Sequence, residues 1–183
     1  MSSRVRAFFG LPLPKEHREA LGPYIASCDA LAPEFRWVPA ANLHLTVRFI
    51  GGVDRALVED IADRVAKPRL AGFDLALGDL GTFKRGRLVR VAWLGVTSGV
   101  EAARALAAQV EAACIAAGLE AEKRPFQAHL TLARARPRLG AALPRLPEPP
   151  RLKPWKADEL VLYESHLSPK GSVYEALRSL RMD

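Results

Sequence analysis

Apolar and polar residues alternate along several segments of the chain, as expected of β-strands that bury one face. Most of these segments end near glycine or proline, which favour turns. The pattern predicts strands over residues 4–11, 36–38, 43–49, 73–80, 88–96, 126–133, 159–166 and 173–180. The pair Gly51-Gly52 is predicted to end the third of these strands.

Apolar residues recur at helical spacing in three other segments. The predicted helices cover residues 15–27, 54–65 and 100–117. Pro14 suits the first turn of the first helix, Asp54 is a suitable N-cap for the second, and Gly118 is a stop signal after the third. Residues 136–154 are rich in proline and arginine, and we expect them to form an ordered but irregular surface loop.

The tripeptide His-Leu-Thr occurs twice, at His44–Thr46 and at His129–Thr131, with nearly half of the chain between the two copies. Both copies lie in predicted strands, where side chains two residues apart share a face. Each histidine therefore shares a face with its threonine, while the intervening leucine faces the core. Two such strands side by side would present two imidazoles and two hydroxyls to one cleft, which suits proton transfer around a bound oxyanion.

Each half of the chain holds helices and one His-Leu-Thr strand, which suggests a distant internal duplication. We therefore predict an α+β fold in which residues 1–183 form a single domain of two lobes. Mainly antiparallel sheets are expected to face a shared groove. Outside the tripeptide the repeat is too weak to establish from the sequence alone.

The composition is that of an ordinary globular protein, with 49% hydrophobic and 26% charged residues. The two cysteines, Cys28 and Cys114, lie in helix-like segments and suggest no disulfide framework. The N-terminus lacks an apolar leader and no apolar run reaches the length of a membrane span, so we expect a cytoplasmic protein that does not bind membranes. The net charge of +7 favours polyanionic partners, although Arg-rich composition alone could produce it.

Four stretches of the chain, residues 6–14, 42–51, 126–134 and 162–174, carry a resemblance to a known family. They resemble the two-histidine phosphoesterase superfamily, and within it the RNA 2′,3′-cyclic phosphodiesterases, also named 2′-5′ RNA ligases. The resemblance implies a bilobal, pseudo-symmetric fold with the sheets around a central cleft and the helices outside. It also implies hydrolysis of RNA terminal 2′,3′-cyclic phosphates to 2′-phosphomonoesters by a monomer, without a metal ion or another cofactor.

The resemblance also implies roles for individual residues. His44 would donate a proton to the leaving 3′-oxygen, and His129 would accept a proton from water. Thr46 and Thr131 would bind the non-bridging phosphate oxygens. Arg134 occupies a position from which it could neutralise phosphate, but strict alternation places it on the face opposite His129, so this role requires the strand to end or bulge there.

The remaining candidates have simpler interpretations. By alternation, Arg48 shares a face with His44 and is expected at the rim of the cleft. His17 lies among charged neighbours and is expected to be solvated, while His166 precedes a turn and is a weak candidate for a direct role. A zinc site is not expected, because no HExxH or Cys-x-x-Cys motif accompanies the histidines.

Three functions stay open from the sequence. The first is hydrolysis of cyclic phosphates at RNA ends, with the reverse reaction, 2′-5′ ligation, allowed by the same chemistry. The second is a two-histidine phosphodiesterase for small cyclic or 2′-5′ linked nucleotides. The third is an RNA-binding module without turnover, against which the intact histidine and threonine pairs argue.

Overall fold

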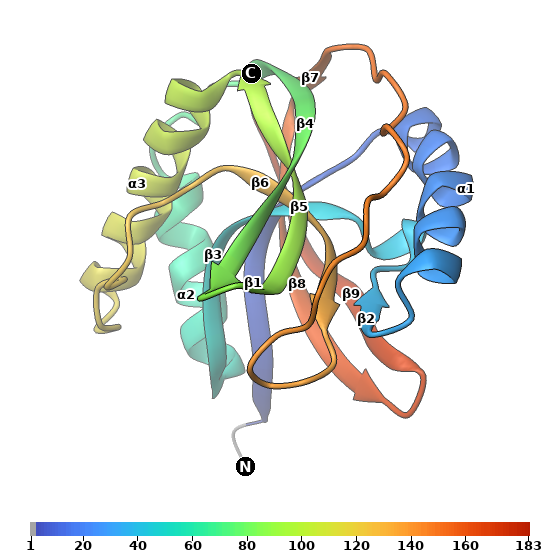
Figure 1. Cartoon of the computed structure of the whole chain (residues 1–183). Coiled ribbons are helices and arrows are strands. Elements are labelled where there is room, and N and C mark those ends of the chain that lie inside the picture. Colours follow the sequence, from blue (N-terminus) through green and yellow to red (C-terminus); the bar gives the residue numbers. More distant parts are fainter. Residues whose placement is uncertain (1–2) are drawn as a thin grey trace.

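Two antiparallel β-sheets make up the centre of the computed structural model, which describes residues 3–183 (Figure 1). The four-stranded sheet has the order β3-β1-β8-β9, and the five-stranded sheet has the order β2-β6-β5-β4-β7. The strands are β1 Arg4–Pro12, β2 Phe35–Trp37, β3 His44–Asp54, β4 Phe73–Arg85, β5 Leu88–Ser98, β6 His129–Ala135, β7 Trp155–Ala157, β8 Glu159–Ser168 and β9 Gly171–Arg181. The predicted α+β class with antiparallel sheets is confirmed.

Three α-helices and one short 3₁₀ helix flank the sheets. They are α1 Lys15–Leu31, η1 Ala40–Asn42, α2 Arg55–Ala66 and α3 Val100–Ala116. Figure 1 shows α2 and α3 together on one side of the sheets and α1 on the other. Within residues 3–183, no helix is both long enough and apolar enough to cross a membrane.

The last strands of the chain return to the first sheet. β8 pairs with β1, and β9 extends the sheet beyond β8, so each motif strand belongs to a different sheet: β3 to the four-stranded and β6 to the five-stranded one. β3 and β6 nevertheless contact each other where the two sheets meet. Leu45 and Leu130 are buried in the core between the layers, as the alternation predicts.

The predicted boundaries of both motif strands differ from the structure. Gly51-Gly52 does not end its strand, which continues to Asp54. Gly51 instead adopts a φ of +89° at an irregularity in the β1–β3 pairing. The second motif strand begins at His129, so residues 126–128 approach it outside any strand. Residues 136–154 form the predicted irregular loop.

The expectation that His17 is solvated is wrong. Its side chain is only 3% exposed, and Nε2 donates a hydrogen bond to the Lys153 carbonyl at 2.7 Å. The long loop packs against α1 here, and the Tyr24 hydroxyl donates to the Pro147 carbonyl in the same region. His17 lies one helical turn before the buried Leu21, so the two side chains share the buried face of α1. The charged residues next to His17 in the sequence concealed this spacing.

Candidate active site

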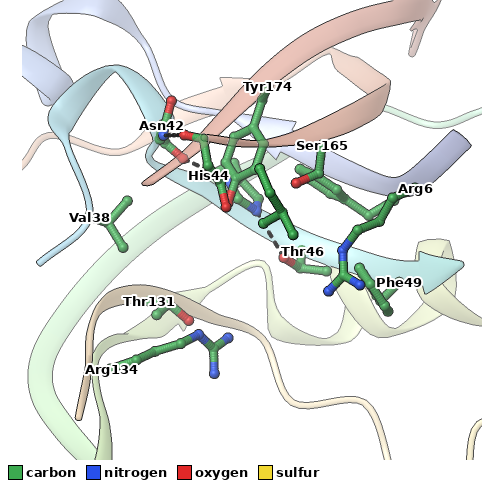
Figure 2. Close-up of a pocket in the computed structure, with 13 residues that line it drawn as sticks. Arg6, Val38, Asn42, His44, Thr46, Phe49, Thr131, Arg134, Ser165 and Tyr174 are labelled. Atoms are coloured by element: carbon green, nitrogen blue, oxygen red, sulfur yellow. Dashed lines mark hydrogen bonds between the residues drawn. The ribbon is translucent and has the colours of Figure 1, made fainter. Parts of the chain in front are cut away.

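A cavity of about 380 Å³ opens next to the first His-Leu-Thr motif (Figure 2). Two strands from different sheets supply its predicted residues. His44 and Thr46 come from β3, and Thr131 and Arg134 come from β6. The structure therefore brings four of the five predicted site residues to one cavity.

The fifth residue, His129, lines an adjoining groove of about 380 Å³. The groove runs along α3, where Ala107 and Ala108 form part of its wall, and it shares Thr46 with the first cavity. Thr46 thus lies between two spaces, with one imidazole in each. The positive charge of His129 is among the causes that lower the pKa of His44, as expected for two neighbouring rings.

Both motif strands contain one extra residue directly after the threonine. In the β1–β3 pairing Gly10 faces Thr46 and Phe9 faces Arg48, so Val47 is the extra residue. In the β5–β6 pairing Trp93 faces Thr131 and Ala92 faces Ala133, so Leu132 is the extra residue. An extra residue reverses the alternation of the strand beyond it.

The second bulge places Arg134 in the cavity. Because Leu132 and Ala133 are both buried, the alternation resumes with Arg134 exposed on the side of Thr131. The condition stated for a role of Arg134, a bulge in the strand, is therefore met. Figure 2 shows its guanidinium extending from β6 beside Thr131.

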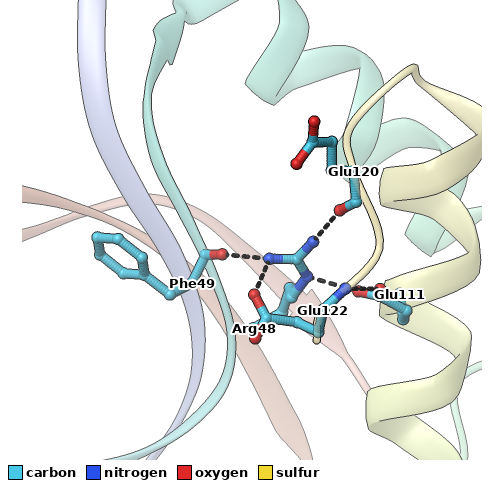
Figure 3. Close-up of polar contacts among 5 residues, drawn as sticks. All are labelled: Arg48, Phe49, Glu111, Glu120 and Glu122. Atoms are coloured by element: carbon cyan, nitrogen blue, oxygen red, sulfur yellow. Dashed lines mark hydrogen bonds and ion pairs between the residues drawn. The ribbon is translucent and has the colours of Figure 1, made fainter. Parts of the chain in front are cut away.

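The first bulge turns Arg48 away from the cavity of His44, so the expected face shared with His44 is wrong, and the side chain lines the groove of His129 instead. The Arg48 side chain is 8% exposed and enters a polar network beside α3 (Figure 3). Nε donates to Glu111 at 2.5 Å, while Nη1 donates to Glu122 at 2.6 Å and to the Phe49 carbonyl at 2.7 Å. Nη2 donates to the Glu120 carbonyl at 2.8 Å.

This network joins the two halves of the site. Arg48 follows Thr46 by two residues, and Glu120 and Glu122 belong to the segment that leads into His129. The amide of Glu122 also donates to the carboxylate of Glu111. One guanidinium therefore fixes the approach of the second motif against the strand of the first.

The two imidazoles are held in the same way. Nδ1 of His44 donates to the Asn42 carbonyl at 2.7 Å, and Nδ1 of His129 donates to the Gln127 carbonyl at 2.7 Å. A carbonyl only accepts, so Nδ1 carries the hydrogen in both rings and Nε2 is the nitrogen left for proton exchange. In His44, Nε2 lies 3.0 Å from the hydroxyl of Thr46.

Aromatic side chains surround both imidazoles. Phe8 and Tyr174 lie 4.7 Å and 5.2 Å from the His44 ring, between centroids. Phe83 lies 5.1 Å from the ring of His129. Gly10 allows β1 to approach, since a Cβ there would lie 3.2 Å from Cδ2 of His44.

Burial lowers the pKa of both histidines below the ordinary value. For His44, the charges of Arg134 and His129 lower the pKa further, while the Asn42 carbonyl opposes the shift. For His129, Arg134 also lowers the pKa and the Gln127 carbonyl opposes it. Both rings therefore favour the neutral form when no anion is bound.

Several residues that shape the cavity were not predicted from the sequence as site residues. Arg6, Asn42 and Tyr174 line the cavity, and the Asn42 side chain also donates to the Ser172 carbonyl of β9 at 2.7 Å. All of them lie in the four stretches that carry the family resemblance, which is the signal that could have identified them.

His166 does not line the cavity of His44. It is exposed on the β8–β9 hairpin, with Nε2 3.2 Å from Glu175, and with Glu164 it forms a group whose ligand atoms lie within 4.8 Å of one another. Within residues 3–183 this is the group close enough to share a metal ion, and it does not include the motif histidines.

Substituting Arg48 tests the network that joins the two halves. Arg48→Met should lower the free energy of unfolding by about 3 kcal/mol, because it leaves the carboxylate of Glu111 half-buried without its partner. Urea denaturation measures the change. The matched control is Arg104→Met, which removes an exposed pair with Glu101 and should cost less than about 1 kcal/mol. Equal losses in the two variants would contradict the inference.

Known proteins resemble this chain in sequence and in fold. The family model described as LigT like Phosphoesterase matches the chain twice, over residues 11–93 and 94–174. Each match contains one His-Leu-Thr motif. The double match supports the pseudo-symmetric halves predicted from the repeat.

Relatives with a curated name are called RNA 2′,3′-cyclic phosphodiesterase. The Escherichia coli protein is 35% identical over 135 residues, which cover 73% of this chain and 74% of that protein. The Geobacillus stearothermophilus protein is 29% identical over 95% of this chain, and the Aeropyrum pernix protein is 39% identical over 51% of it. The match spans about half the length of these last two relatives, 56% and 53%.

Solved structures share the fold over nearly the whole chain. E. coli LigT complexed with 3′-AMP superposes with a TM-score of 0.84 at 28% identity, covering 98% of this chain and 99% of that chain. TT0787 of Thermus thermophilus gives 0.81 at 29% identity, covering 97% of each chain. Together with the double match over residues 11–93 and 94–174, this establishes that the chain belongs to the LigT-like phosphoesterase family.

Proposed function

We propose that this protein is a hydrolase that opens the 2′,3′-cyclic phosphate at RNA ends to a 2′-phosphomonoester. It acts as a single two-lobed domain and a monomer, by acid–base catalysis between His44 and His129 and without a metal ion. The observation that carries the proposal is the placement of two imidazoles, each with Nδ1 bonded to a carbonyl and Nε2 left for proton exchange, in the two spaces that meet at Thr46. The curated name of the relatives and the 3′-AMP complex of E. coli LigT support it.

The reaction requires a nucleophile on one side of phosphorus and a leaving oxygen on the other, roughly in line. His44 stands in the cavity lined by Phe8 and Tyr174, which offers room and aromatic surface for the nucleoside that carries the leaving 3′-oxygen. His129 stands in the adjoining groove, from which water can approach. This arrangement supports His44 as the proton donor and His129 as the proton acceptor.

The proposed step moves two protons. Nε2 of His129 takes a proton from the attacking water as the new P–O bond forms. The P–O3′ bond breaks, and protonated His44 gives its Nε2 proton to O3′, which leaves a 2′-phosphate and a free 3′-hydroxyl. Thr46 and Thr131 donate hydrogen bonds to the non-bridging oxygens, and Arg134 neutralises their charge.

The same groups can open the cyclic phosphate with a 5′-hydroxyl in place of water as the nucleophile. This reaction would form a 2′-5′ phosphodiester bond. The groove beside His129 holds about 380 Å³, far more than one water molecule occupies, so it has space for such an acceptor. We therefore include reversible 2′-5′ ligation in the proposal.

The decisive experiment incubates the protein with an RNA that ends in a 2′,3′-cyclic phosphate, in the presence of EDTA. We expect complete conversion to the 2′-phosphomonoester, identified by chromatography against both isomers. A 3′-phosphate product would overturn the assignment of the leaving group, and a requirement for a divalent ion would overturn the two-histidine mechanism.

The second prediction concerns the histidines themselves. His44→Ala and His129→Ala should each lower kcat by at least about 10²-fold, because each removes one positioned proton-transfer group. His166→Ala is the matched control and should retain the parent activity, since its ring pairs with Glu175 outside the cavity. Circular dichroism checks that each variant is folded. Near-parent turnover by either motif variant would refute the pairing.

The third prediction concerns pH. Because burial lowers the pKa of His44 and His129, both should titrate below an ordinary histidine in the free protein, followed by NMR of the ring protons. Inorganic phosphate should raise both pKa values, since an anion stabilises imidazolium. A folded pKa below the unfolded one means that these rings stabilise the fold fully above the unfolded value, and that this stability is lost as pH falls through the folded value. Phosphate-independent titration would contradict the anion site.

A further inference from the structure

Arg6 and Phe49 form a pair on the cleft side of the four-stranded sheet. The guanidinium carbon of Arg6 lies 4.8 Å from the centroid of the Phe49 ring. Both residues line the cavity of His44, yet the Phe49 ring is 43% exposed. An exposed aromatic ring with an arginine over it, inside a cavity, has surface available for a ligand.

The strand register places this pair beyond the reacting centre. In the β1–β3 pairing, Gly10 faces Thr46 and Phe8 faces Phe49. Two residues of β1 therefore separate the level of Thr46 from that of Phe49, which is about 7 Å along the strand. A phosphorus bound beside Thr46 would therefore be separated from the guanidinium of Arg6 by about the length of one nucleotide.

The pseudo-symmetry shows that this feature belongs to one half only. Phe49 follows His44 by as many residues as Arg134 follows His129, and the two bulges bring both to the cleft face. At this position the second half has the guanidinium of Arg134. The first half has the phenyl ring of Phe49, and the guanidinium of Arg6 from the neighbouring strand β1 lies over this ring.

The cavity therefore holds two cationic groups, Arg134 and Arg6 (Figure 2). A cyclic phosphodiester carries a single negative charge, and Arg134 lies beside Thr131, where it would meet that charge. Among the lining residues in the described part of the chain, none is a carboxylate that could pair with Arg6. The charge pattern fits a substrate with a second anionic group.

We propose that Arg6, oriented by Phe49, binds the 5′-phosphate of the terminal nucleotide, which in RNA is the phosphodiester to the preceding residue. This subsite rests on the proposed function and deepens it. It favours RNA ends over nucleoside 2′,3′-cyclic phosphates, which lack that phosphate. The protein thereby recognises the RNA strand that precedes the cyclic phosphate as well as the cyclic phosphate itself.

Three substrates test the subsite: adenosine 2′,3′-cyclic phosphate, the same compound with a 5′-phosphate, and the dinucleotide ApA ending in a 2′,3′-cyclic phosphate. The parent protein should prefer both substrates with the additional phosphate by about tenfold in kcat/KM, the lower range for a hydrogen bond between charged groups. The preference should lie mainly in KM, because the contact forms equally in the ground and transition states.

In Arg6→Ala the preference should fall to near one, whereas Arg6→Lys should keep part of it through the remaining charge. The matched control, Arg64→Ala, removes an arginine of α2 that pairs with Asp60, and should leave the preference unchanged. Phe49→Ala should reduce the preference in the same direction as Arg6→Ala, because the guanidinium loses its support.

The outcomes separate the subsite from the proposed function. Turnover of all three substrates by the parent protein without a preference would overturn the subsite alone, as would equal losses on all three substrates in Arg6→Ala. No turnover of any substrate by the parent protein would overturn the proposed function and this inference with it. A preference that Arg6→Ala removes and Arg64→Ala keeps would support both.

Discussion

The single extra residue after each motif threonine is the constraint on which the whole site depends. Side chains of a strand alternate with a period of two, so one inserted residue exchanges the two faces for everything beyond it. In β6 the insertion at Leu132 turns Arg134 into the cavity. In β3 the insertion at Val47 turns Arg48 away from the cavity of His44 and Phe49 toward that cavity.

The first bulge places a guanidinium in the interior, and the Arg48 network shows how the fold satisfies it. Its three nitrogens all donate hydrogen bonds, to two carboxylates and two carbonyls. In the second half the same position holds Ala133, which is fully buried and needs no partner. Both halves therefore contain the bulge, but the residue that follows the extra residue differs. Only in the first half is it an arginine, which links β3 to the segment leading into His129.

The parts of the structure that were predictable are those that depend on local periodicity. Alternation within His-Leu-Thr placed His44 and Thr46 on one face and Leu45 in the core without knowledge of any neighbour. The bulges could not be predicted, because neither Val47 nor Leu132 is a glycine or proline and the extra residue is defined only by the partner strand. The burial of His17 depends in the same way on a loop more than a hundred residues away.

The two imidazoles are held so similarly that they cannot by themselves set the direction of the proposed reaction. Each donates from Nδ1 to the carbonyl two residues earlier at 2.7 Å, and burial lowers the pKa of each. What differs is the wall around each ring, with Phe8, Phe49 and Tyr174 on one side of Thr46 and the α3 groove on the other. Two such similar imidazoles act separately as acid and base only when the substrate is held in one orientation. The direction of the reaction must therefore be set by the residues around each ring, and these residues differ between the two halves of the chain.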